Sequence, residues 1–175
     1  SGLGGGAFAL YWDASERRLT SFDGRERAPL SADPIYWLGP DGAPIPWPDA
    51  VVGGRSVGVP GTPMLLETLH ARYGRLDRAA LVAPAIETAE RGFAVSPRLA
   101  GLIEDAADFA LDRFPETRAC FFRPDGAPRA EGEILTNPAL AETLRLFAEQ
   151  GAAPFYKGPL AEGIIEAVRT RTNPG

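Results

Sequence analysis

The sequence predicts an α+β fold in which a β-hairpin precedes a mainly α-helical lobe. The hairpin is predicted by residues 7–12, an apolar run that follows a glycine-rich start, is rich in aromatic residues and is too short for a normal helix. Prolines then interrupt regular structure between residues 29 and 63. After these prolines, apolar residues recur at helical spacing to the end of the chain, which predicts the helical lobe.

Length and composition limit the classes of protein to consider. The 175 residues suit one domain, and a hydrophobic fraction of 45% can supply a core. We expect a sheet hairpin over residues 1–27, an ordered proline-rich loop over 28–61 and the helical lobe over 62–175. A net charge of -5 with scattered basic residues argues against binding to nucleic acid or an anionic membrane. No apolar run is long enough for a membrane-spanning helix.

The predicted hairpin presents a charged corner. A polar turn at residues 13–17 leads into a returning strand at 18–22, which delivers the charged residues 23–26 at its end. The glycines before the first strand indicate that the backbone closely approaches another element. Residues 2–7 also fit the dinucleotide-binding pattern G-x-G-x-x-[GA]. We reject that reading because the pattern needs a preceding strand and a following helix, whereas here a strand follows.

The proline-rich segment is expected to be an ordered loop rather than a free linker. It contains Trp37 and Trp47, and a linker has little use for two such large apolar side chains. We expect both tryptophans to be buried and to attach the loop to the body of the protein.

Five helices are expected after this loop, and capping residues mark their starts. The first has Thr62 as its N-cap and ends at Gly74, and the second begins after Asp77 and ends at Gly92. Pro84 should break or kink the second helix near its second turn, because proline lacks the amide that the helix needs.

The remaining three helices are expected to start after Ser96, Asn137 and Gly158, each of which precedes a proline. Between the first two of these helices, residues 120–122 and 133–135 flank a Pro-Asp-Gly turn. That arrangement predicts a short hairpin or a paired loop.

Cys120 and His70 are the only cysteine and histidine in the sequence. A single residue of each type excludes an internal disulfide and any metal site built from several cysteines or histidines. We expect no metal and no cofactor. Cys120 lies among apolar residues and is expected to be a small core residue rather than a nucleophile. His70 lies in a helical pattern and is expected to pack rather than to catalyse.

Six motifs occur in a recognisable order, at residues 1–8, 23–29, 57–62, 73–76, 84–96 and 148–158. Together they resemble the large subunit of the gamma-glutamyltranspeptidase family, and the resemblance spans essentially the whole chain. It implies that the chain is a single fragment of that subunit, and the absent initiating Met suggests that sequence upstream is missing. The hairpin would then come from the αββα sandwich of an N-terminal-nucleophile hydrolase.

The resemblance implies a role for Arg25. From the residues alone, Arg25 between Asp23 and Glu26 fits an ion-paired surface arginine as well as it fits a ligand-binding one. By resemblance, Arg25 binds the α-carboxylate of the gamma-glutamyl donor, and Asp23 or Glu26 supports its guanidinium. Gly24 stands where relatives often place a bulkier residue, which leaves the shape of the donor pocket open.

The implied enzyme is a gamma-glutamyltransferase or hydrolase acting on donors such as glutathione. It forms a gamma-glutamyl-threonine intermediate and passes the group to amino acids, peptides or water. The nucleophilic threonine, freed by self-cleavage, belongs to a small subunit as partner, so the fragment has no catalytic residue and is expected to be inactive alone. A periplasmic or secreted location is implied, and a cytoplasmic one stays open.

Three alternative readings remain open. Relatives of similar sequence include cephalosporin or glutaryl acylases and polyglutamate-processing enzymes. The third alternative belongs to another class, a non-catalytic helical interaction module that has kept the fold of the large subunit.

Overall fold

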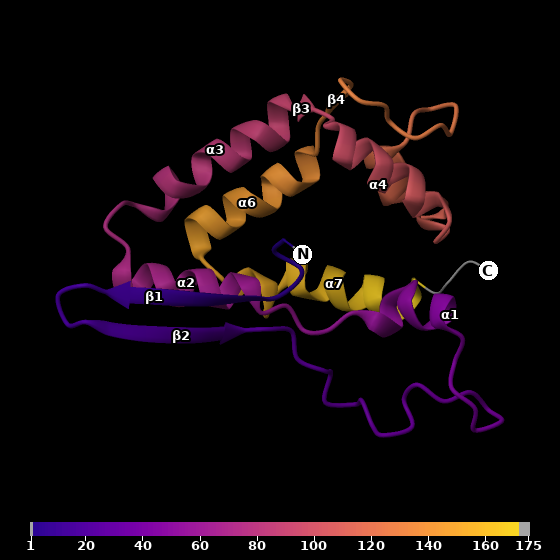
Figure 1. The fold of residues 1–175 in the computed structure, drawn as a ribbon, viewed down its shortest axis with the longest axis horizontal. Helices are drawn as coiled ribbons and strands as arrows, with labels where there is room; N and C mark the ends of the chain where they lie inside the picture. The colour runs from indigo at the N-terminus through magenta and orange to yellow at the C-terminus, as the bar shows by residue number, and fades with distance from the viewer. Residues whose placement is uncertain (1, 172–175) are drawn as a thin grey trace.

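The structure is a computed structural model that describes residues 2–171, apart from the side chain of Ala107. Figure 1 shows a hairpin beside one helix, a pair of helices above them, and a smaller helical unit at one end. The elements are, in chain order, β1 (Ala7–Asp13), β2 (Arg18–Gly24), α1 (Trp47–Val51), η1 (Gly54–Ser56), α2 (Thr62–Tyr73), α3 (Arg78–Arg91), β3 (Phe93–Ala94), α4 (Pro97–Ala107), η2 (Leu111–Arg113), α5 (Pro115–Phe121), β4 (Ile134–Leu135), α6 (Pro138–Gln150), η3 (Ala153–Phe155) and α7 (Pro159–Thr170).

The predicted hairpin is confirmed. β1 and β2 pair antiparallel, with Ala7 opposite Gly24 and Asp13 opposite Arg18. The carboxylate of Asp13 accepts a hydrogen bond from the backbone amide of Ser15 at 2.9 Å, which stabilises the turn between the strands. This register brings the glycine-rich segment that precedes β1 beside the charged end of β2.

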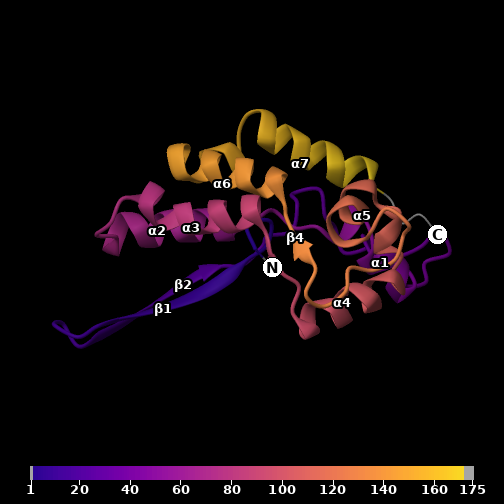
Figure 2. The ribbon, with the colours of Figure 1, turned by 90° about the horizontal axis from the view of Figure 1, so that it is seen from above.

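The two faces of the hairpin have different neighbours. On one face, the ring of Tyr11 stacks on that of Tyr73 in α2, with centroids 3.6 Å apart. On the other face, three apolar side chains are each more than half exposed, namely Phe8, Leu10 and Trp12. Figure 2 shows the hairpin extending away from the helices. The described residues pair only two strands here, so the sheet-on-sheet sandwich stays a prediction.

The helices α3 and α6 pack along one another. Arg78, the first residue of α3, donates hydrogen bonds to the carbonyl oxygens of Ala148 and Glu149, at 3.0 and 3.1 Å. These carbonyls lie in the last turn of α6 and have no partner within that helix, so the arginine stabilises the helix end.

One buried cluster joins the helices to the start of the chain. It consists of Phe147, Ala152 and Phe155, and Leu3 from the glycine-rich segment packs against it. The rings of Phe147 and Phe155 meet edge to face, with centroids 6.2 Å apart. The cluster therefore holds the entry to β1 against α6 and η3.

A second buried cluster lies in the smaller helical unit and consists of Val95, Ile103, Phe122 and Leu135. Cys120 packs against it and is partly buried, as expected of a small core residue. Burial raises the pKa of the Cys120 thiol, which opposes formation of a nucleophilic thiolate.

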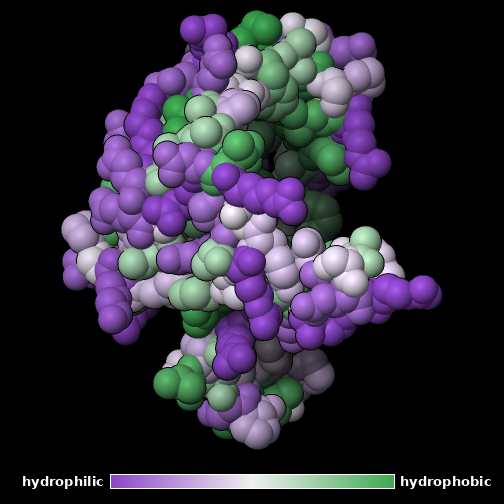
Figure 3. Space-filling model, turned by 90° about the vertical axis from the view of Figure 1, so that its left-hand side faces the viewer, coloured by the Kyte–Doolittle hydropathy of each residue, from purple (hydrophilic) through white to green (hydrophobic). Residues whose placement is uncertain are grey.

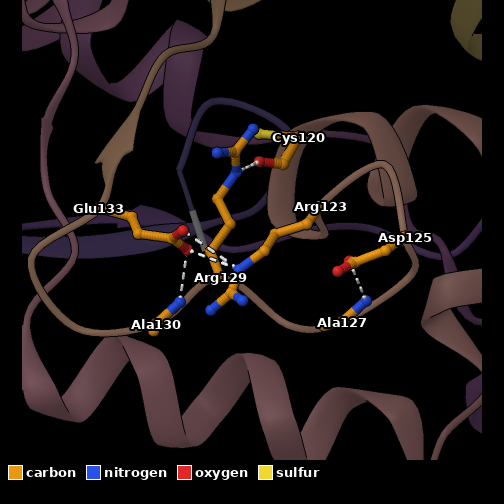
Figure 4. Close-up of polar contacts among 7 residues, drawn as sticks. All are labelled: Cys120, Arg123, Asp125, Ala127, Arg129, Ala130 and Glu133. Atoms are coloured by element: carbon orange, nitrogen blue, oxygen red, sulfur yellow. Dashed lines mark hydrogen bonds and ion pairs between the residues drawn. The ribbon is translucent and has the colours of Figure 1, made fainter.

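A polar network supports the loop that follows α5, and Figure 4 shows its members. Arg123 contacts the Glu133 carboxylate through Nε at 3.1 Å, and the amide of Ala130 donates to the same carboxylate at 2.7 Å. These two contacts, the amide first, hold the pKa of Glu133 below its usual value. Arg129 donates to the carbonyl oxygen of Cys120 at 2.8 Å, so this network ties the loop to α5.

The predicted hairpin between residues 120–122 and 133–135 does not form. Most of the first segment ends α5, and most of the second forms β4, which pairs with β3 instead. A paired loop does close across the Pro-Asp-Gly turn, where Phe122 bridges to Pro128. Leu135 is buried in the second cluster, so burial rather than the local turn selects the partner of β4.

Two predicted helix starts are confirmed by their side-chain caps. Ser96 Oγ accepts a hydrogen bond from the amide of Leu99 at 3.2 Å, and Asn137 Oδ1 accepts one from that of Leu140 at 3.0 Å. The predicted start of α7 after Gly158 is also confirmed.

The first helix start differs from the prediction. Gly61 is the N-cap of α2, and Thr62 is already the first helical residue. The hydroxyl of Thr62 is buried and has no hydrogen-bond partner among residues 2–171. The second helix does start after Asp77, but the side chain of Asp77 makes no capping bond.

The sequence predicts that Pro84 breaks or kinks the second helix, and the break does not occur, because α3 runs through Pro84 from Arg78 to Arg91. The missing amide removes only one hydrogen bond of the ladder, and packing along α6 stabilises the helix on both sides of the proline. Near the end of α2, a ring nitrogen of His70 lies 2.8 Å from the carbonyl oxygen of Leu76, in agreement with its expected structural role.

The expected burial of the two tryptophans is also wrong. Trp37 is 43% exposed and Trp47 is 74% exposed. The loop attaches instead through hydrogen bonds to the C-terminal part of the chain. The amide of Gly54 donates to the carbonyl oxygen of Arg171 at 2.7 Å, and the Tyr156 hydroxyl donates to that of Pro60 at 2.8 Å. Figure 3, seen from the side of the hairpin turn, shows other hydrophobic residues at the surface near the top and the bottom of the molecule.

Candidate functional site

Three segments that are far apart in the sequence meet at the end of β2. The carbonyl oxygen of Gly5 accepts hydrogen bonds from the amides of Gly61 and Thr62, at 2.9 and 3.0 Å. Arg27 and Val59 exchange both of their backbone hydrogen bonds, at 3.3 and 2.8 Å. The glycine-rich start, the charged strand end and the segment before α2 thus form one corner.

Close backbone contact at this corner requires glycine. A Cβ added at Gly6 would lie 2.6 Å from the amide nitrogen of Glu26 and 2.7 Å from the Cα of Arg25. A Cβ added at Gly61 would collide with the carbonyl oxygen of Gly24. The close approach that the glycines predicted is therefore found, and it is made to the residues around Arg25.

Arg25 lies at this corner with both of its acidic neighbours. Its Nε is 3.1 Å from the Glu26 carboxylate, and its guanidinium carbon is 5.8 Å from the centroid of the Phe8 ring. Asp23 accepts a hydrogen bond from the backbone amide of Arg25 at 2.9 Å. Glu26 therefore contacts the guanidinium, whereas Asp23 holds the backbone.

The charge state of Glu26 is well defined. Hydrogen bonds from its own backbone amide, from Arg25 and from the amide of Gly6 hold the pKa of Glu26 below its usual value. The carboxylate is therefore ionised at neutral pH. Within the described chain, no hydrogen bond engages the two terminal nitrogens of Arg25, whose side chain is 64% exposed.

A cavity of about 580 Å³ adjoins the corner, within the size range of small-molecule sites. Residues from all three segments and from the proline-rich loop line it, including Gly5, Arg25, Arg27, Tyr36, Trp37 and Arg55. Three arginines face this space, and the only acidic residue that lines it is Glu26, already paired with Arg25. The cavity therefore favours an anionic ligand.

A larger cavity of about 910 Å³ lies between the segment from Pro29 to Pro60 and α7. Its walls are mainly apolar, and they do not include Arg25. We regard the smaller cavity as the candidate site because several charged groups converge there, and Arg55 lies between the two cavities.

The sequence singled out Arg25 and its acidic neighbours as candidates but did not single out Arg27 and Arg55, which line the same cavity as Arg25. Each of the two lies within or next to a motif that the sequence already singled out, which is the signal that could have found them. Between residues 2 and 171, no group of three or more His, Cys, Asp and Glu residues could hold a metal ion. In the same part of the chain, no helix has both the length and the apolar character to cross a membrane.

Comparison with known proteins identifies relatives of this chain. The model of the family described as gamma-glutamyltranspeptidase matches residues 1–173. The glutathione hydrolase proenzyme of Bacillus subtilis (strain 168) is 36% identical over 170 residues, which cover 97% of this chain and 28% of that protein. The chain thus spans just over a quarter of this relative's length.

Solved structures agree with the sequence match. The gamma-glutamyltranspeptidase of Helicobacter pylori superposes with a TM-score of 0.90 at 31% identity, covering 97% of this chain and 48% of that one. A cephalosporin acylase from Bacillus halodurans superposes with a TM-score of 0.76 at 32% identity, covering 93% of this chain and 30% of that one. The motifs, the fold and the family match agree, and the chain belongs to the gamma-glutamyltranspeptidase family.

Proposed function

We propose that this chain is part of an enzyme that cleaves the gamma-glutamyl amide bond of glutathione-like donors, and that Arg25 binds the α-carboxylate of the donor. The proposal rests on one observation. Arg25 lies beside an arginine-lined cavity where three of the family's motif segments meet. The relative named as a glutathione hydrolase supports the class of donor.

Arginine suits this task because its planar guanidinium can donate two parallel hydrogen bonds to a carboxylate. Glu26 contacts Nε of Arg25, which leaves the two terminal nitrogens for the donor. Asp23 accepts from the amide of Arg25 and so orients the backbone at the end of β2. In this proposal Glu26 and Asp23 are positioning residues and do not touch the substrate.

The catalytic step belongs to another part of the enzyme. We place a nucleophilic threonine at the head of a small subunit, where its amine accepts the proton of its hydroxyl. The hydroxyl oxygen attacks the gamma-amide carbon, the amine of the leaving group departs with a proton, and a gamma-glutamyl ester remains. Water or an amino acid then resolves the ester.

Several further expectations belong to the same proposal. Residues 1–175 alone should be inactive, because they lack the nucleophile of this mechanism. We also propose that these residues are one fragment of the large subunit, divided into a hairpin, a proline-rich loop and a helical lobe. We propose a periplasmic or secreted location for the enzyme.

An acylase is the second candidate, because the cephalosporin acylase of Bacillus halodurans superposes well on this chain. A glutaryl amide and a gamma-glutamyl amide both present a terminal carboxylate to Arg25, but only the gamma-glutamyl donor carries an α-amine. Gly24 is buried at this corner, where an added Cβ would lie 2.6 Å from the Cβ of Leu65. Comparing kcat/KM on the two amides decides between the candidates.

The test of the proposal uses Arg25→Lys in the full-length processed protein. The charge stays but the two-pronged contact is lost, so kcat/KM on a gamma-glutamyl anilide should fall about ten- to a hundredfold. Arg18→Lys is the matched control, because Arg18 is exposed and pairs with Glu16 near the hairpin turn, away from the cavity. Unchanged kinetics in Arg25→Lys, or an equal fall in both variants, would remove Arg25 from the site.

A further inference from the structure

Arg55 lines the same cavity as Arg25 but comes from a different part of the chain. It is the middle residue of η1, which follows α1 and lies at the end of the proline-rich loop. Neither its position in the sequence nor the proposed function gives it a role. Its surroundings nevertheless define the geometry of its guanidinium closely.

A reciprocal contact with Tyr36 holds Arg55 in place. The guanidinium donates through Nη1 to the carbonyl oxygen of Tyr36 at 3.2 Å, and the Tyr36 hydroxyl donates to the carbonyl oxygen of Arg55 at 3.1 Å. The guanidinium carbon also lies 5.5 Å from the centroid of the Tyr36 ring. These contacts orient the side chain at the cavity wall, and two of its three guanidinium nitrogens make no hydrogen bond to the described residues.

Arg55 faces the smaller cavity without an acidic residue of its own there. The only carboxylate among the residues that line this cavity is Glu26, which pairs with Arg25. The partners of its guanidinium are a neutral carbonyl group and a tyrosine ring. An oriented arginine with free donors beside a cavity is suited to bind a carboxylate.

We propose that Arg55 determines donor specificity by binding a second carboxylate, the one carried by the leaving group of a gamma-glutamyl peptide. This inference rests on the proposed function, in which Arg25 holds the α-carboxylate of the same donor. Both arginines line one cavity of about 580 Å³, which is large enough for a short peptide. The ligand class is a gamma-glutamyl peptide with a free C-terminal carboxylate, in contrast to a donor with a neutral leaving group.

The test compares two donors that differ only at this carboxylate, gamma-glutamylglycine and gamma-glutamylglycinamide. In the full-length processed protein, Arg55→Gln removes the charge and keeps a donor for the carbonyl oxygen of Tyr36. We expect kcat/KM to fall about ten- to a hundredfold for gamma-glutamylglycine, with less than a threefold change for the amide. Arg55→Lys should recover part of the loss. Equal losses on both donors, or no loss on either, would overturn the proposal.

Two control variants separate binding by Arg55 from other effects. Arg27→Gln removes the same charge from the same cavity, so an equal preference for the amide in that variant would attribute the effect to net charge and overturn the role of Arg55. Tyr36→Phe removes one of the contacts that hold Arg55, so it should lower the discrimination between the two donors less than Arg55→Gln does. An equal or larger loss in Tyr36→Phe would attribute the effect to the loop rather than to the guanidinium.

The outcome also separates this inference from the proposed function. Arg25→Lys should impair both donors by the same factor, because both carry the α-carboxylate. If Arg25→Lys impairs both while Arg55→Gln impairs neither, the proposed function stands and the role of Arg55 is wrong. A protein that turns over neither donor would overturn both proposals.

Discussion

The corner at the end of β2 and the helical pair α3–α6 are stabilised in different ways. At the corner, glycines bring backbone directly against backbone, and Gly5 accepts hydrogen bonds from Gly61 and Thr62. In the helical pair, side chains fill the contact, and Phe147 is only 4% exposed. The side chains that carry the proposed chemistry, Arg25 above all, remain exposed at the corner.

This difference explains how the corner can leave its charged side chains available. Because the backbone itself forms the packed contact there, Arg25 need not be buried to hold the segments together. In the helical pair the apolar side chains are the contact, so they have no freedom to bind a ligand. A substitution should therefore act at the corner through the backbone and in the helical pair through lost volume.

The largest effect is expected from Phe147→Ala in α6. Removing a buried ring should lower the free energy of unfolding by about 3–5 kcal/mol through lost transfer energy and a cavity. Leu140→Ala is the control, because Leu140 lies in the same helix and is 40% exposed. Urea denaturation of the full-length protein measures both variants, and similar losses would mean that burial in α6 does not set the stability of the helical pair.

The next effect tests the corner. Gly61→Ala should lower the free energy of unfolding by about 1–3 kcal/mol, because the new methyl group meets the carbonyl oxygens of Gly24 and Arg25. Gly163→Ala in α7 adds the same methyl group where no atom lies within 4 Å. It should stabilise the protein by about 0.5–1 kcal/mol through helix propensity. Effects of the same sign in both variants would contradict the backbone contact at the corner.

The smallest effect concerns the starts of the two paired helices. Asn137 caps α6 through a hydrogen bond to the amide of Leu140, whereas Asp77 precedes α3 without such a bond. Asn137→Ala should therefore cost about 1 kcal/mol of unfolding free energy, and Asp77→Ala clearly less. Shifts in the urea midpoint give the comparison, and a larger loss in Asp77→Ala would show that the caps are assigned wrongly.

Prediction from the sequence worked best where the signal is local. The starts of α4 and α6 follow from Ser96 and Asn137, since a cap bonds to an amide only three residues away. The ends of α3 and α6 follow from Gly92 and Gly151, which adopt positive φ angles that favour glycine. At the candidate site, a continuous motif singled out Arg25 with both of its acidic neighbours, and their role in binding stays a prediction.

Prediction failed where distant contacts compete with local rules. Pro84 is a helix breaker by local rules, yet α3 continues through it while packed along α6. The pairing of β4 with β3 depends on the burial of Leu135 in a cluster that draws on α4 and the end of α5. The exposure of Trp37 and Trp47 likewise depends on which surfaces lie near the loop.

The sequence by itself determined the hairpin, most of the helix starts and ends, the family and the candidate Arg25. Each of these depends on residues within a few positions of one another or on the order of motifs along the chain. Only the tertiary structure decided that Arg25 and Arg55 share a cavity and that Glu26, rather than Asp23, contacts the Arg25 guanidinium. The shared cavity depends on contacts between segments far apart in the sequence, from Gly4 to Gly58, and the packing of the intervening chain sets such contacts. The Glu26 carboxylate also accepts a hydrogen bond from the amide of Gly6, which belongs to another segment.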